Sequence, residues 1–323
     1  MNRIVLKKAL IEVRLLFAAC AATLFAFCWL RVWIVSRLEM SSFAQIIEQL
    51  WDKWKDFSPV PLSQLLSYAG RIAMGYDEPI VVFTVAIFAV ARGSDAVAGE
   101  LNRGSMEMLL AQPVSRLQVL YSQAVVTVGA LLLLAFASWA GTWAGIQAHK
   151  VVEEEPPPSL KIPGFGFEIP LSFSPGKKIT VPMRERVDAM KLLPGAVNLF
   201  ALGFCWAGIA TLVSSADRYR WRTIGIVSTL FVLQLIAKIA GLAIPKLRWL
   251  SNLTVFTAYE PQKYVSVAVN MPNQTWAMLL RDSQGQVIDL GPLGYNLILV
   301  GIGAVCYLAA GAVFHRRDLP APL

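Results

Sequence analysis

Charged residues are scarce in this sequence. Asp, Glu, Lys and Arg make up 15% of its 323 residues, whereas a soluble domain carries about 25%. Hydrophobic residues reach 56%, above the roughly 45–50% of soluble domains. The net charge is +8, but the basic residues flank apolar runs and form no single long patch. These features exclude a soluble globular protein and a nucleic-acid-binding protein, and they predict that most of the chain faces lipid.

Metal-ligating and nucleophilic residues are also few. The two histidines, His149 and His315, lie far apart at the edges of apolar runs. All four cysteines fall inside such runs without a CxxC spacing: Cys20, Cys28, Cys205 and Cys306. This pattern argues against a zinc or redox site. A membrane-embedded enzyme would need clustered His, Asp, Glu or Cys near the end of a span, which makes it the weakest interpretation.

Nucleotide-binding motifs are missing as well. The only Gly-Lys pair is Gly176-Lys177, with Leu171 where a P-loop needs Gly and Lys178 where it needs Ser or Thr. A dinucleotide fingerprint is also incomplete, since Ile169 follows Gly164 and Gly166 in place of the third glycine. We therefore expect no enzymatic activity and no directly bound cofactor.

The N-terminus lacks a small-residue cleavage site followed by a polar mature region. We predict that its apolar stretch is retained as the first membrane span. The basic residues before that span predict a short amphipathic helix along the membrane surface.

Apolar runs of about 20 residues are long enough to cross the hydrocarbon core as helices. The whole chain, 1–323, is predicted to be a single all-α transmembrane domain. Its six predicted spans are 13–35, 72–91, 117–148, 192–213, 223–244 and 293–314.

The distribution of Lys and Arg predicts the orientation of these spans. With the N-terminus inside, the internal segments carry 12 basic residues over 57 positions, and the external ones 15 over 128. Both termini are therefore predicted to be cytoplasmic, as is the segment 94–116. The loops 148–191 and 245–292 are predicted to be extracytoplasmic. Prolines and alternating apolar residues predict a small β-hairpin in the first of these loops. A helical apolar period from Phe43 to Trp54 predicts an amphipathic helix between spans one and two.

A few polar and small residues within the spans are candidates for function. Asp77 and Glu78 precede Pro79: they either flank a helix start at the headgroups or form a gate or substrate contact. Lys238 is a further candidate contact, although we expect it, like Arg31, to extend toward the headgroups. Gly141 and Gly145 form a G-x-x-x-G pair, which predicts close helix packing within the chain or between subunits.

The charged segment 94–116 interrupts the apolar pattern. Ser94 is predicted to cap one short helix, and Gly104 to end it in a left-handed conformation. Ser105 is predicted to cap a second helix, whose apolar side includes Met106 and Leu109. That side is small, so we expect it to need a partner.

The stretch "GELNRGSMEMLLAQPVSR" resembles the cytoplasmic coupling segment of type 2 ATP-binding cassette (ABC) permeases. That family shows Glu, then Gly-Thr-x-Glu-x-Leu-Leu, then Pro and Arg. Ser105 replaces the usual Thr, and Gln123 stands where Lys is frequent. The C-terminal "FHRRDL" also looks like the family's ending. The resemblance assigns ATPase coupling to Glu100, Arg103, Gly104, Ser105, Met106, Glu107, Leu109, Leu110, Pro113 and Arg116.

The resemblance implies a multi-pass protein of the plasma membrane, the inner membrane of a bacterium. It implies export driven by a separate cytoplasmic ABC ATPase, which would hold the ATP and Mg²⁺. Further implied partners are a second permease copy or a paralogue, the lipid bilayer and an extracytoplasmic protein, but no nucleic acid. A secondary transporter, or another polytopic protein without an ATPase partner, is the alternative. That class would show ionisable residues at the membrane midplane and two related halves.

Overall fold

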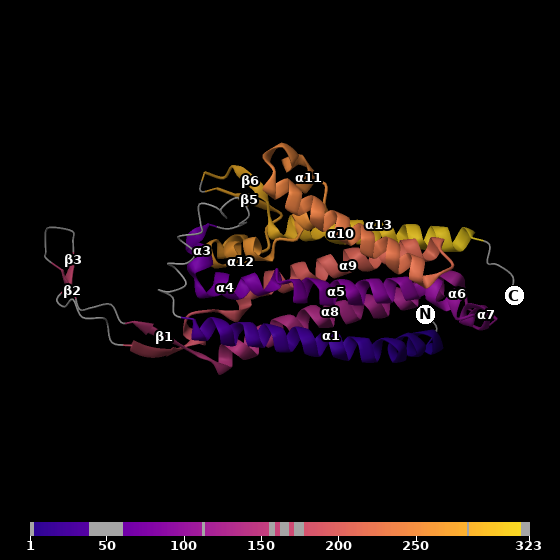
Figure 1. Ribbon diagram of the computed structural model, residues 1–323, viewed down its shortest axis with the longest axis horizontal. Helices are drawn as coiled ribbons and strands as arrows, with labels where there is room; N and C mark the ends of the chain where they lie inside the picture. The colour runs from indigo at the N-terminus through magenta and orange to yellow at the C-terminus, as the bar shows by residue number, and fades with distance from the viewer. Residues whose placement is uncertain are drawn as a thin grey trace.

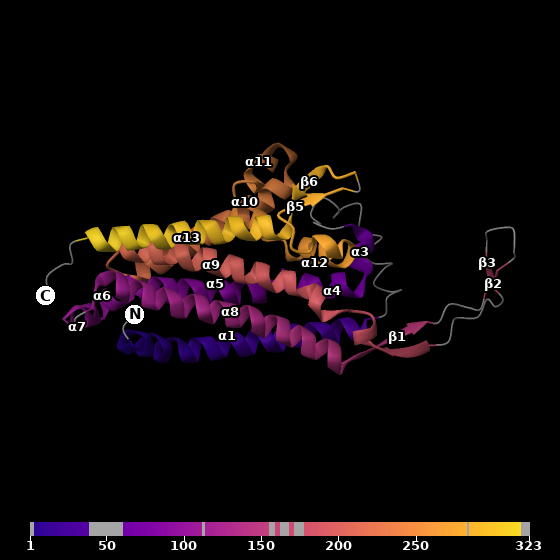
Figure 2. The ribbon, with the colours of Figure 1, turned by 180° about the vertical axis from the view of Figure 1, so that it is seen from behind.

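A computed structural model describes residues 3–38, 61–111, 114–154, 159–161, 168–170, 178–282 and 284–317. Within these ranges, six helical segments are long and apolar enough to cross a membrane, which confirms the all-α membrane fold. They form one elongated bundle in which α1 begins and α13 ends on the same side (Figures 1 and 2). We call this side the N/C end, and the opposite side, which carries the strands β1 and β4, the hairpin end. The six segments are Arg3–Arg37, Tyr68–Asn102, Arg116–Ala148, Ala189–Ala216, Arg220–Ala243 and Pro292–Arg316.

Helix α1 (Arg3–Arg37) runs without interruption. The prediction of a separate surface helix before the first span is therefore wrong. The stretch contains neither Gly nor Pro, so no residue in it breaks the helical backbone. Val5, Ala9 and Val13 are buried at intervals of four residues, and they continue the stripe that the span itself packs into the bundle. At 1.5 Å per residue the helix is about 52 Å long, which exceeds the ~30 Å hydrocarbon core.

The second membrane segment is built from several helical pieces. They are α4 (Tyr68–Ala73), a 3-10 turn (Met74–Tyr76), α5 (Pro79–Ser94), a π-helical turn (Asp95–Gly99) and α6 (Glu100–Asn102). Pro79 occupies the first turn of α5, as predicted, because a helix start does not need the missing N–H. Ser94 does not cap a helix. It lies within continuous helical backbone, and its hydroxyl donates to the Ala91 carbonyl instead.

Helix α8 (Arg116–Ala148) begins with a capping box between Ser115 and Gln118. It packs along α1, and two glycines allow the close approach. A Cβ on Gly141 would lie 2.3 Å from the Phe25 carbonyl oxygen, and one on Gly145 would lie 2.7 Å from Val32 Cβ. Gly141 and Gly145 thus lie against a helix of the same chain.

Helix α9 (Leu193–Ala216) lies at the centre of the bundle, between α5, α8 and α13 (Pro292–Arg316). Its Trp206 is fully buried against Phe231 and Phe256. Helix α10 (Arg220–Ala243) is far more exposed, and it packs on α5 and α9 from one side only. An apolar helix exposed on most of its surface fits a lipid environment.

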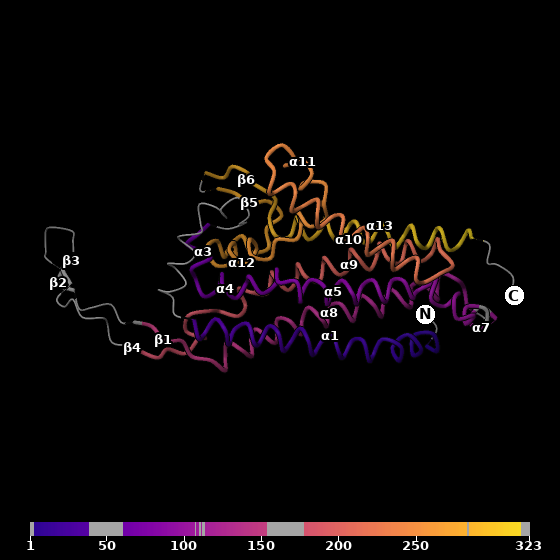
Figure 3. Tube along the Cα trace, viewed as in Figure 1, coloured from indigo at the N-terminus to yellow at the C-terminus, as the bar shows by residue number. Residues whose placement is uncertain are grey.

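The hairpin end carries small elements outside the bundle. β1 (Lys150–Glu154) pairs antiparallel with β4 (Lys178–Pro182), as Figure 3 shows, and β2 (Ser159–Lys161) pairs with β3 (Glu168–Pro170). A small hairpin was predicted in this loop. The last loop holds α11 (Arg248–Ser251), α12 (Pro261–Asn270) and the pair β5 (Leu279–Arg281) and β6 (Val287–Leu290). Helix α3 (Leu62–Leu66) precedes α4, whereas the helix predicted from Phe43 to Trp54 lies outside the described residues.

Candidate functional site

The segment Asp95–Leu110 projects at the N/C end, where Figure 1 shows α6 and α7 beyond the end of α5. Gly104 separates α6 from α7 (Ser105–Leu110) and has φ of 69°, the left-handed conformation that the sequence predicts. Ser105 is the first residue of α7. Its hydroxyl donates to the Glu100 carboxylate.

Glu100 is completely buried and holds three other side chains. Lys8 Nζ, from α1, lies 2.6 Å from both carboxylate oxygens. Arg103 Nη2 lies 3.3 Å from Oε1, and the Ser105 hydroxyl bonds to Oε2. A buried carboxylate is stable only when it is paired in this way. The prediction that Glu100 contacts a partner protein is therefore wrong, since its side chain connects α1 to the start of α7.

Asp95 is a second buried carboxylate, one helical turn before Glu100. Its nearest cations are Arg103 at 2.7 Å, Arg92 at 3.4 Å and Arg220 at 3.4 Å, the last from the start of α10. Arg92 also donates to Gln123 Oε1 of α8 at 2.6 Å. Position 123, where Lys is frequent in the family, therefore holds a neutral acceptor, whereas a Lys there would repel Arg92. Burial by itself lowers the pKa of Arg103, but the hydrogen bond and charge of Asp95 outweigh burial and raise it.

The π-helical turn is stabilised from α9. Ser214 accepts hydrogen bonds from the backbone N–H groups of Val97 and Ala98, and it donates to the Ser94 carbonyl. A π turn changes the partners of these backbone groups, and one buried hydroxyl supplies the replacements. Nothing in the local sequence around residues 95–99 indicates this role of a residue more than 110 positions away.

The apolar side of α7 is covered by the chain itself. Met106 and Leu109 are 1% and 8% exposed, and they pack with residues of α1, α8 and α13, including Phe314. The expectation that these two side chains need a partner protein is therefore wrong. The exposed surface of the segment instead includes Arg103 and Met108, and Met108 is 69% exposed. Met108 was missed because it lies off the 3–4 spacing that marked the apolar face.

The remaining predicted coupling residues divide into two groups. Arg116 donates to the Arg317 carbonyl at 2.6 Å, and Arg317 in turn donates to the carbonyls of Ser215 and Asp217. Arg116 therefore holds the end of α13 against α8 and α9, a role that we did not predict. The side chains of Glu107 and Leu110, and the whole of Pro113, lie outside the described residues.

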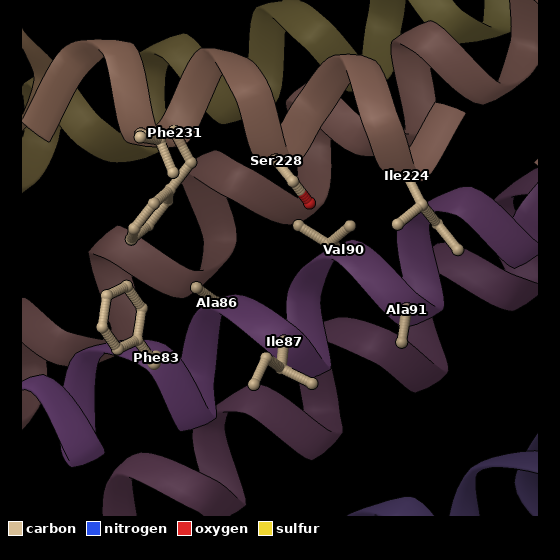
Figure 4. Close-up of a pocket in the computed structure, with 9 residues that line it drawn as sticks. Phe83, Ala86, Ile87, Val90, Ala91, Ile224, Ser228 and Phe231 are labelled. Carbon is tan, nitrogen blue, oxygen red and sulfur yellow. The ribbon is translucent and has the colours of Figure 1, made fainter. Parts of the chain in front are cut away.

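Two adjoining hollows lie between α5 and α10, and we call them together the α5–α10 groove. The hollow nearer the N/C end has a volume of about 340 Å³. Figure 4 shows Phe83, Ile87 and Val90 of α5 facing Ile224, Ser228 and Phe231 of α10. The second hollow, of about 240 Å³, lies nearer the hairpin end, and Phe83 lines both. Ile87 and Val232 are 60% and 48% exposed, so the groove is open along its outer side.

The candidate gate residues are only partly brought together. Asp77 and Lys238 line the same hollow. Glu78 instead pairs with Arg31 Nη1 at 3.2 Å, and Arg31 also donates to the Arg71 carbonyl. The Arg31 guanidinium is therefore bound by groups of the same chain.

Lys238, for which the same extension was predicted, is also bound by groups of the chain. Its Nζ donates to the Phe256 carbonyl at 2.6 Å and lies 3.7 Å from Glu260 Oε1. These acceptors belong to the loop that follows α10.

No curated protein sequence matches the chain. The sequence profile described as ABC-2 family transporter protein matches residues 34–319, which is most of the chain and includes the segment at the N/C end and the α5–α10 groove. Together with the six apolar helices, this match identifies a multi-pass membrane protein and a transport component. The chain belongs to the ABC-2 family of transporter proteins.

Proposed function

We propose that the chain is the transmembrane permease subunit of an ABC exporter, and that a separate cytoplasmic ATPase binds at the N/C end. One observation carries this proposal. The segment Asp95–Leu110 is bonded directly to three membrane helices, yet it presents Met108 and Arg103 at its surface. The three connections are Glu100 with Lys8 of α1, Ala98 with Ser214 of α9, and Asp95 with Arg220 of α10.

These connections would transmit a displacement of the segment to the bundle. Separating a buried carboxylate from its cation leaves an unpaired charge, which costs about 3–5 kcal/mol. When the ATPase moves α7, moving α1 and α10 together with the segment is therefore less costly than breaking the pairs at Glu100 and Asp95.

The proposal extends to the complete assembly. The ATPase would hold ATP and Mg²⁺, and this chain would bind no cofactor itself. The further partners would be a second permease copy or a paralogue, an extracytoplasmic protein and the lipid of a bacterial inner membrane. The resemblance of the segment to the coupling elements of type 2 permeases supports this arrangement, and it supports export as the direction.

Met108→Asp tests the contact with the ATPase. The substitution places a charge at the exposed Met108 side chain, so we expect the affinity for the partner ATPase to fall about tenfold or more. Met278→Asp is the matched control, because Met278 is 57% exposed and lies at the hairpin end. Copurification and permease-dependent ATPase activity are the measurements.

Equal ATPase binding by both variants and the wild type would contradict the proposed docking surface. Transport that continues without any ATPase would instead favour a secondary transporter. The observation that favours this second candidate is the placement of Asp77 and Lys238 in one membrane-facing hollow.

A further inference from the structure

The α5–α10 groove has the dimensions of a site for a long, thin ligand. From Asp77 to Ala91 the chain advances about 21 Å along the helix axis, at 1.5 Å per residue. This length exceeds one leaflet of a ~30 Å hydrocarbon core. The walls along it are apolar, with Phe83, Ala86 and Val90 on one side. A ligand that fills the groove must therefore bury an apolar body of comparable length.

The polar groups of the groove are concentrated at its hairpin end. Lys238 is held by acceptors of the protein, namely the Phe256 and Tyr259 carbonyls and Glu260. Asp77 lies in the same hollow and is exposed. Within the described part of the chain, Asp77 forms no ion pair. Its carboxylate has about four positions that can accept hydrogen bonds.

The charged groups around this hollow therefore sum to a net negative charge. The carboxylates of Asp77 and Glu260 face the single ammonium of Lys238, whereas Glu78 is neutralised by Arg31. The excess of one negative charge lies at the end of an apolar groove.

We propose that the α5–α10 groove binds a cationic amphiphile, with its ammonium group beside Asp77 and its apolar body along α5 toward Ala91. An anionic headgroup would meet the like charge of Asp77, and a second copy of the chain would bury that carboxylate unpaired. The inference rests on the proposed function only in treating this ligand as transported cargo, because binding itself requires no ATPase.

The test is equilibrium binding to the purified full-length chain in lipid nanodiscs without an ATPase. The probes are a fluorescent long-chain alkylammonium and an alkylsulfonate with the same tail and fluorophore. We expect Asp77→Asn to weaken ammonium binding tenfold or more and to leave sulfonate binding unchanged or stronger. Ala86→Trp fills the hollow nearer the N/C end and should weaken binding of the ammonium probe by a similar factor.

Two controls separate this site from other effects. Glu185→Gln removes one exposed negative charge at the hairpin end, outside the groove, and should leave ammonium binding unchanged. Met108→Asp should also bind the probe normally, so failed coupling and failed binding remain distinguishable. The oligomeric state and thermal stability of each variant show whether it is folded.

Three results would overturn the inference. The first is equal ammonium affinity in wild type and a folded Asp77→Asn variant. The second is a sulfonate affinity that matches the ammonium affinity in the wild type. The third is the absence of probe binding together with a change of oligomeric state in Ala86→Trp, which would mean that a second copy occupies the groove.

Discussion

The two ends of the bundle use charge in opposite ways. At the N/C end, Glu100 and Asp95 are buried, and their partners come from α1 and α10. At the hairpin end, the pairs Arg186–Glu153 and Lys263–Asp289 remain partly exposed to solvent. Exposed ion pairs contribute about 0–1 kcal/mol, whereas breaking a buried one costs several times more. The difference indicates that buried ion pairs keep the helix ends together at the N/C end. At the hairpin end, breaking the ion pairs of the loops costs little free energy.

The largest expected effect comes from Glu100→Gln. It removes the buried negative charge that Lys8 and Arg103 share, and the side chains of these two cations are 31% and 41% exposed. The free energy of unfolding should therefore fall by about 3 kcal/mol, the lower end of the cost of breaking a buried pair. Glu153→Gln is the counterpart at the hairpin end, where the partner Arg186 is 43% exposed, and it should cost about 0–1 kcal/mol. Denaturant unfolding of both variants in detergent measures the difference. Equal losses would remove the contrast between the two ends.

An intermediate loss of stability is expected from a substitution in the contact between α1 and α8, the two helices that connect the two ends. Gly141→Leu forces side-chain atoms against the Phe25 backbone and should lower the free energy of unfolding by about 1–3 kcal/mol. Gly129→Leu on the same helix is the matched control, because no atom lies within 4 Å of a Cβ there. Thermal unfolding of the two variants provides the comparison. If Gly129→Leu were the more damaging change, the close packing of α1 on α8 would be wrong.

The smallest effect concerns Asp289 and its dependence on pH. Partial burial raises the pKa of this carboxyl, but hydrogen bonds from Lys263, the Leu290 N–H and the Tyr295 hydroxyl together lower it below its ordinary value. Because the folded-state pKa is depressed, the stabilisation is complete above the unfolded value of about 4 and is lost as the pH falls through the folded value. Wild type should therefore be slightly more stable than Asp289→Asn near neutral pH.

The two stabilities should converge in acid. Thermal unfolding from pH 3 to pH 7 tests this, with the exposed Glu185→Gln as a control for changes of net charge. If the difference in unfolding temperature between wild type and Asp289→Asn widened as the pH fell, the Lys263–Asp289 pair would not stabilise the fold.

Much of the fold could be predicted because its signals are local. Each apolar run is long enough to span, and the helix start at Pro79 follows from the geometry of proline. The left-handed conformation at position 104 could be predicted because glycine adopts it without strain. The predicted surface helix failed because only the tertiary packing of Val5 and Ala9 shows that α1 continues.

The candidate site was less predictable because its contacts are distant in sequence. Glu100 was expected at a partner interface, yet its cation Lys8 lies 92 positions earlier. Met106 was expected to contact a partner protein, yet residues from three other helices cover it, and Met108 is the exposed residue. A helical period shows which residues share a face, but not which surrounding element covers that face.

The sequence by itself determined the class of this protein and the number of its membrane helices. It also determined that the charged segment lies between the second and third of these helices. The signals of hydropathy, proline and glycine are local to one helical turn or one apolar run. Helices and helix ends can therefore be predicted from them without knowledge of tertiary contacts. Only the tertiary structure decided which charges pair, that Lys238 bonds to the loop after α10, and that Asp77 faces an apolar groove. A charge in a low-dielectric bundle is stabilised by whichever opposite charge or carbonyl the fold brings within a few ångströms, and helix packing sets that distance.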